Sequence, residues 1–210
     1  MHMIYGVEMR VGEIGEVVVR YVRMHCDDPT TLVRRELGVC LGEARVDIAV
    51  INGTLTGWEI KSAQDRLVRL SRQASIYSKV LDRAIVIADV RHLDRVALHI
   101  PEWWGIAKAE AADEFPSVTF LRLPGQNPEI DPFALAQLLW RDEAYKILES
   151  RELHRGMRKA TRWKLWQELA TYLSLDELRL EVRETLKARQ MWLDEARRNQ
   201  DDELSRPVAM

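Results

Sequence analysis

The chain has 210 residues and a net charge of −2 at pH 7, and 47% of its residues are hydrophobic. This composition excludes a disordered chain, and the near-neutral charge excludes a protein that attracts nucleic acid over its whole surface. Two cysteines, Cys26 and Cys40, fit neither a disulfide framework nor a zinc motif, and no apolar segment reaches membrane-spanning length. We therefore expect a reduced, soluble, cytoplasmic protein of one domain with room for an appendage.

The first half of the chain predicts an α/β fold, because helical and strand-like periodicities follow one another along it. A tight reversal is expected at Asn52-Gly53, between two runs of β-type residues. In chain order, the patterns predict a helix over 13–26, a strand over 31–37, a hairpin over 44–62, a helix over 65–82 and a strand buried on both faces over 84–89.

The second half predicts two further strands and a group of helices. A connector over 123–132 holds three prolines and a glycine, which favour an irregular backbone. The expected elements are a helix over 92–99, strands near 103–106 and 117–123, and helices over 133–149, 156–173 and 175–193. We predict a core over 1–128, an α-helical C-terminal extension over 129–193 and a frayed polar tail over 194–210.

The hairpin carries a candidate metal site. Asp47 lies in its first strand, and Glu59 and Lys61 share one face of its second strand because side chains alternate with period two. Two carboxylates on adjacent strands can hold Mg²⁺, which prefers oxygen ligands and keeps several waters. A two-residue loop would place Asp47 opposite Trp58, so that the two acids point to opposite sides of the sheet. The site therefore requires a three-residue loop over 52–54 or a bulge.

The spacing of Asp47 and Glu59-Ile60-Lys61 resembles the signature of the PD-(D/E)XK nuclease superfamily, with Val46 in place of the usual proline. Gln73 and Tyr77, one helical turn apart, resemble the QxxxY pair of its exonuclease-type branches. Several segments within 13–192 together resemble a bacterial family of restriction-endonuclease-like proteins. The resemblance implies a restriction-endonuclease-like core, in which helices flank a central mixed sheet.

This resemblance implies a metal-dependent nuclease that hydrolyses phosphodiester bonds in DNA, in bacterial DNA repair or defence. Its cofactor would be Mg²⁺, with Mn²⁺ as a substitute. The implied roles are metal ligation by Asp47, Glu59 and the carbonyl of Ile60, activation of water by Lys61, and positioning by Gln73 and Tyr77. Glu13 is the first candidate for a further acid of the site, and Glu16 and Glu36 compete with it.

A basic block over 151–164 holds six Lys or Arg residues and one acid. Arg155, Arg158 and Arg162 recur at spacings of three and four, which predicts one side of a helix that follows DNA phosphates together with Lys164. Trp163 and Trp166 are expected to anchor that helix on the core. The alternative interpretation is a solvated helix face.

Two other functions compete with the nuclease. The first is a non-catalytic module of the same fold that binds nucleic acid or a protein. The second is a partner-binding protein that uses the helices over 133–193. The sequence leaves open DNA against RNA, the mode of cleavage and the oligomeric state.

Overall fold

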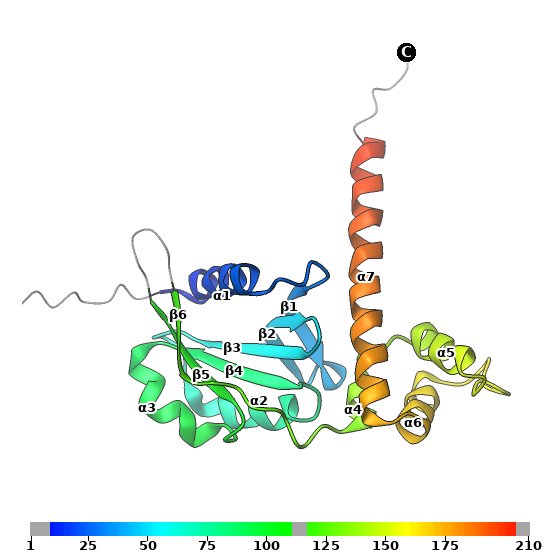
Figure 1. Cartoon of the computed structure of the whole chain (residues 1–210), viewed down its shortest axis with the longest axis horizontal. Coiled ribbons are helices and arrows are strands. Elements are labelled where there is room, and N and C mark those ends of the chain that lie inside the picture. The colour runs from blue at the N-terminus through cyan, green and yellow to red at the C-terminus, as the bar shows by residue number, and fades with distance from the viewer. Residues whose placement is uncertain (1–8, 111–116, 205–210) are drawn as a thin grey trace, which may run out of the picture.

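A computed structural model describes residues 9–110 and 117–204, with side chains up to Gln190. It confirms the α/β class: one six-stranded mixed sheet has helices on both faces and a group of helices at one end (Figure 1). The strands are β1 (Leu32–Val39), β2 (Ala44–Ile51), β3 (Leu55–Lys61), β4 (Arg83–Ala88), β5 (Gly105–Glu110) and β6 (Ser117–Arg122). The α-helices are α1 (Val11–His25), α2 (Leu70–Tyr77), α3 (Leu93–Val96), α4 (Pro132–Ala136), α5 (Arg141–Ser150), α6 (Arg162–Tyr172) and α7 (Leu175–Leu204).

The strands lie side by side in the order β1-β2-β3-β4-β5-β6. The pairs β1–β2, β2–β3 and β5–β6 are antiparallel, whereas β3–β4 and β4–β5 are parallel. A parallel neighbour requires a crossover, which α2 supplies between β3 and β4 and α3 supplies between β4 and β5. β4 is buried on both faces, as its continuous apolar run predicts.

Each face of the sheet has its own apolar core. On one face, α1 packs Ile14, Val18 and Val22 against residues of β2 and β3 that include Trp58 and Ile60. The other face packs against α2, and its core continues without a break into α4, α5, α6 and α7. Alternation along β3 therefore points Trp58 and Ile60 towards α1, and Glu59 and Lys61 towards α2.

The hairpin has the three-residue loop that the candidate site requires. Ile51 pairs with Leu55, and Ile48 pairs with Trp58, so residues 52–54 form the loop. Asn52 closes it, because its side-chain oxygen accepts the backbone N–H of Thr54 at 3.0 Å. Continued by one residue beyond Ile48, this register would place Asp47 opposite Glu59.

Several predicted helices have different bounds: α2 is shorter than the helix expected over 65–82, and only Leu93–Val96 of the helix expected over 92–99 is α-helical. The helix expected over 133–149 is two helices, because Trp140 has an extended backbone and donates its N–H to Glu143 at the start of α5. The helix expected over 156–173 begins only at Arg162, after its cap Thr161. α7 continues past the predicted end to Leu204, and residues 205–210 of the predicted tail lie outside the described ranges.

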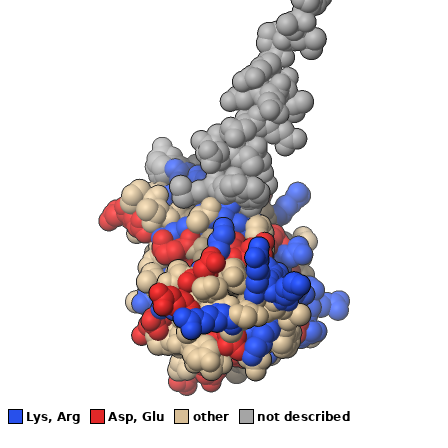
Figure 2. All heavy atoms as spheres, turned by 90° about the vertical axis from the view of Figure 1, so that its right-hand side faces the viewer, with Lys and Arg blue, Asp and Glu red and all other residues tan. Residues whose placement is uncertain are grey.

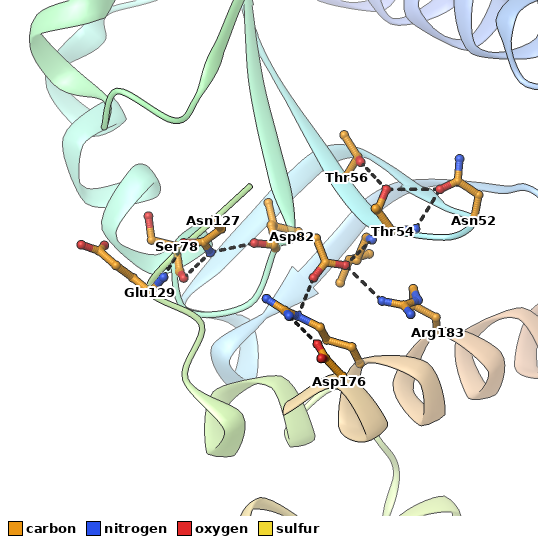
Figure 3. Close-up of polar contacts among 12 residues, drawn as sticks. Asn52, Thr54, Thr56, Ser78, Asp82, Asn127, Glu129, Asp176 and Arg183 are labelled. Carbon is orange, nitrogen blue, oxygen red and sulfur yellow. Dashed lines mark hydrogen bonds and ion pairs between the residues drawn. The ribbon is translucent and has the colours of Figure 1, made fainter. Parts of the chain in front are cut away.

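Asp82 joins the sheet to α7 (Figure 3). Its carboxylate lies 2.9 Å from the guanidinium of Arg179 and 3.3 Å from that of Arg183, and it accepts the N–H of Leu55 at 2.7 Å. Asn127, in the connector before α4, donates to two carbonyl groups beside the same end of β4. The C-terminal helices therefore have a fixed place against the sheet, while the division at residue 128 stays a prediction. Among the described helices, none is long and apolar enough to cross a membrane.

Candidate functional site

Four predicted site residues meet in a buried polar cluster between β3 and α2. Glu59 and Lys61 are only 2% and 6% exposed. Lys61 Nζ lies 2.6 Å from Glu59 Oε1, and the Gln73 amide nitrogen donates to the same oxygen at 2.6 Å. Tyr77 lies 2.8 Å from Glu59 Oε2, and the Gln73 amide oxygen accepts from Lys61 at 3.1 Å. The buried carboxylate thus has a cation and two neutral donors.

α2 supplies Gln73 and Tyr77 on one face, because residues four apart in a helix are neighbours. The hydroxyl of Tyr77 lies within hydrogen-bond distance of both Glu59 and the carbonyl of Arg45, and its ring stacks on Trp104 at 5.9 Å. Burial raises the pKa of the Tyr77 phenol above its usual value, and the charge of Glu59 adds to this shift. Tyr77 is therefore a neutral hydrogen-bond donor that holds Glu59 in place.

Asp47 lies beside this cluster, where β2 separates from β3. Ladder pairing between the two strands stops at Ile48, and the carboxylate of Asp47 instead accepts the backbone N–H of Ile60 at 2.7 Å. Burial and then repulsion by Glu59 raise the pKa of Asp47 to about 7, against opposing effects of the Ile60 N–H and of Lys61. The environment therefore favours the neutral form of Asp47 more than water does.

The three candidates for a further acid have other partners. Glu13 accepts the backbone N–H of Arg10 at the start of α1, and Glu16 pairs with Arg35 at 2.8 Å. Glu36 pairs with Arg45 at 3.4 Å, and its charge also contributes to the raised pKa of Asp47. Across the described residues, no group of three or more His, Cys, Asp or Glu side chains is assembled for a metal. The donors on hand are the carboxylates of Asp47 and Glu59 and the backbone of Ile60.

Residues 151–161 of the basic block form an irregular connector between α5 and α6, and residues 162–164 of the block begin α6. The prediction that Arg155, Arg158 and Arg162 line one side of a helix is wrong, because α6 begins only at Arg162. Lys164 pairs with Glu168, and Arg151 pairs with acids of α7. The side chains of Arg155, Arg158 and Arg162 remain exposed, as does that of Lys159, which the helical spacing of the arginines does not single out.

Arg141, at the start of α5, holds this connector in shape. Its guanidinium donates to the carbonyl of Ala160 at 3.2 Å and to that of Arg158 at 2.5 Å. Backbone hydrogen bonds from Met157 to His154 and from Ala160 to Met157 add two turns. The exposed cations therefore extend from a backbone of defined conformation. Figure 2 shows this side of the molecule, where Lys and Arg gather beside acidic residues.

The two tryptophans of α6 behave differently from each other. Trp166 is buried and donates its indole N–H to the carbonyl of Leu139 at 3.0 Å, so it anchors α6 as predicted. Trp163 is 54% exposed. The prediction that both rings anchor the helix is therefore right for Trp166 only.

Comparison with known proteins identifies relatives among phage proteins. A family model described as Bacteriophage P4 protein cII matches residues 15–205. Protein cII of Enterobacteria phage P4 is 24% identical over 160 residues, which cover 73% of this chain and 58% of that protein. The chain thus spans less than two thirds of this relative. No solved structure matches the chain.

These matches correct the identification that the hairpin motif suggested. The matching family is that of phage P4 protein cII and not a PD-(D/E)XK nuclease family. The prediction of a bacterial nuclease, a hydrolase of DNA repair or defence, is therefore wrong. The motif spacing does not by itself identify a nuclease, because Glu59 and Lys61 also form a buried ion pair whose remaining hydrogen bonds Gln73 and Tyr77 satisfy.

Proposed function

The chain belongs to the family of bacteriophage P4 protein cII, and from its structure we propose that it is a nucleic-acid-binding protein whose partner is DNA. The connector between α5 and α6, together with the first residue of α6, is the proposed binding surface. It contacts phosphates through Arg155, Arg158, Lys159 and Arg162.

One observation carries this proposal: three cations of the connector have no carboxylate partner among the residues that the structure describes. Arg151 and Lys164, at the two ends of the block, each have a carboxylate partner. Arg155, Arg158 and Lys159 are exposed and form no ion pair with the described residues. Free cations on a fixed backbone suit phosphates, because binding releases the counterions of the nucleic acid without a cost of breaking existing ion pairs.

Replacing Arg155, Arg158 and Lys159 together by Gln is expected to weaken binding to all DNA sequences alike. The plot of log K against log salt should lose about 0.9 of slope for each phosphate contact removed from duplex DNA. Fluorescence anisotropy of a labelled duplex at several salt concentrations measures both quantities.

The matched control replaces Arg66, Arg69 and Arg72 by Gln. These arginines are also exposed, so the change in net charge is the same at a different place, before and within α2. Equal losses in both triple variants would mean that overall charge and not the connector governs binding, and an unchanged salt slope in the connector variant would contradict the proposal.

A finer description of the fold is also part of this proposal. α1, the antiparallel strands β1, β2 and β3, the crossover helix α2 and the parallel strand β4 follow the order of a restriction-endonuclease-like core. We infer this arrangement from element order and strand direction. It concerns the fold alone and carries no hydrolytic activity.

A divalent cation, Mg²⁺ with Mn²⁺ as a substitute, is proposed at Asp47 and Glu59, with the Ile60 carbonyl as a third donor. The raised pKa of Asp47 supports this placement, because it reports two poorly solvated carboxylates that repel each other. Lys61 neutralises Glu59 but leaves Asp47 with an excess of negative charge. A bound cation would supply the missing positive charge.

Asp47→Asn is expected to stabilise the folded chain at pH 8, in EDTA, by about 2 kcal/mol. The folded pKa of Asp47 is raised above its unfolded value, so the wild-type penalty is absent below about pH 4 and fully present above about pH 7. Asparagine removes this charge, while its side-chain oxygen still accepts the N–H of Ile60. Urea unfolding of both proteins at pH 4 and pH 8 measures the difference.

The same pair of proteins tests the cation. Mg²⁺ at millimolar concentration should raise the melting temperature of the wild-type chain at pH 8 and leave Asp47→Asn unchanged. An equal response of both proteins would contradict the placement of the cation, and a less stable Asp47→Asn in EDTA would contradict the assigned repulsion.

A further inference from the structure

Trp163 is an exposed aromatic residue next to the proposed binding surface. It lies in the first turn of α6, directly after Arg162, and its side chain is more exposed than buried. The ring of Phe133 meets it edge-on at 4.9 Å, which holds the indole in position without covering it. Since Trp166, one turn on, already anchors α6, the exposed ring is available to a partner.

Cations lie close to Trp163 along the chain. Arg162 directly precedes it, with its guanidinium 5.4 Å from the ring of Trp166, and Arg158 and Lys159 stand in the connector that leads into α6. Arg141 donates to the carbonyls of Arg158 and Ala160, so the cations and the indole extend from one segment whose backbone is held in place. A group of cations binds any polyanion. An exposed aromatic ring next to the cations favours a polyanion that also carries aromatic groups able to stack on it.

Unpaired bases meet both requirements. In a duplex, the faces of the bases are stacked on each other and closed to a side chain, but a single strand presents them beside its phosphates. We propose that Trp163 stacks on a base of single-stranded nucleic acid, while Arg158, Lys159 and Arg162 contact the adjacent phosphates. This inference rests on the proposed function, and it adds that the surface prefers single-stranded to double-stranded nucleic acid.

The test compares single-stranded and duplex ligands. A labelled oligothymidine of about 16 nucleotides and a duplex of equal length are titrated with the wild-type chain, Trp163→Leu, Trp163→Phe and Tyr172→Leu. Tyr172 is the matched control, because it is an equally exposed aromatic residue at the other end of α6. Heparin, which carries negative charge without bases, is the third ligand.

We expect Trp163→Leu to bind the oligothymidine roughly tenfold more weakly and to bind the duplex and heparin as the wild type does. Trp163→Phe should retain part of the affinity, since a phenyl ring still stacks and keeps the contact with Phe133, and Tyr172→Leu should bind like the wild type. Oligothymidine should also quench wild-type tryptophan fluorescence more than that of Trp163→Phe.

Three results would overturn the inference. If Trp163→Leu binds the oligothymidine like the wild type, stacking is wrong while binding through the connector stands. If it loses heparin and oligothymidine equally, Trp163 shapes the surface and does not read bases. If the wild-type chain binds neither nucleic acid, the proposed function fails and this inference fails with it. Thermal melts confirm that each variant is folded, and Trp163→Phe decides the question if Trp163→Leu is not.

Discussion

Lys61→Met is expected to destabilise the folded chain by about 3–5 kcal/mol at pH 7. Lys61 and Glu59 are both buried, and the ammonium group is the cation that accompanies the Glu59 carboxylate. Its removal leaves a buried negative charge with only the neutral donors Gln73 and Tyr77. Truncating one partner of a buried ion pair costs more than the pair itself contributes, because the remaining charge stays desolvated.

Chemical denaturation in urea measures this loss, and two further proteins interpret it. Glu59→Gln combined with Lys61→Met should recover most of the stability, since the double variant buries no charge. Lys108→Met makes the same substitution in a partly exposed ion pair with Glu110, and should change stability by less than about 1 kcal/mol. A loss for Lys61→Met no larger than that of Lys108→Met would contradict the assigned role of the pair.

The gathering of these side chains could be predicted from short-range periodicities. Alternation in β3 puts Glu59 and Lys61 on one face, and the helical repeat puts Gln73 and Tyr77 on one face of α2. The length of the hairpin loop could not be predicted in the same way, because Asn52-Gly53 is equally compatible with a two-residue turn. The structure selects the longer loop, in which the side chain of Asn52 accepts the N–H of Thr54.

Other features depend on contacts that are distant in sequence. The separation of β2 from β3 at Asp47, where a carboxylate replaces a strand carbonyl, has no local signal. The basic block has the spacing of a helix, yet Gly156 has a left-handed backbone and Thr161 caps α6, so the preceding residues form turns fixed by Arg141. Gly156 and Thr161 are residues that favour a break in a helix between Arg155 and Arg162. The spacing of the arginines favours a continuous helix, and the sequence alone does not decide between the two.

The sequence predicts the function less well than it predicts the fold, because the chemistry of a residue type depends on its environment. Asp47, Glu59 and Lys61 in a hydrated cleft suit metal-assisted hydrolysis. In this fold, however, Lys61, Gln73 and Tyr77 satisfy the hydrogen bonds of the buried Glu59, and Asp47 lies beside that cluster. The motif spacing is the same in both cases, and the family match over residues 15–205 is what separates them.

Asp82→Asn is expected to weaken the attachment of α7 to the sheet and to lower the free energy of unfolding by about 3 kcal/mol. The side chain of Asp82 is 4% exposed and lies against Arg179 and Arg183 of α7 (Figure 3). An asparagine keeps the acceptor for the Leu55 N–H but removes the negative charge between two partly buried guanidinium groups. The two cations then face each other with only the exposed Asp176 beside Arg179 to offset their repulsion, so the contact of α7 with the chain at the start of β4 becomes less favourable.

Asp176→Asn is the matched control for this experiment. Asp176 also pairs with Arg179, at 2.9 Å, but its side chain is 90% exposed, so its charge is screened by water and its loss should cost less than about 1 kcal/mol. Hydrogen exchange locates the effect: Asp82→Asn should lose protection in the 175–190 part of α7 before it does so in β3 and β4.

Because α6 packs against α4 and α7, opening at Asp82 should also weaken DNA binding by the connector, although the substituted residue lies outside the basic block. Equal stabilities of the two variants would mean that apolar packing alone holds α7 on the sheet.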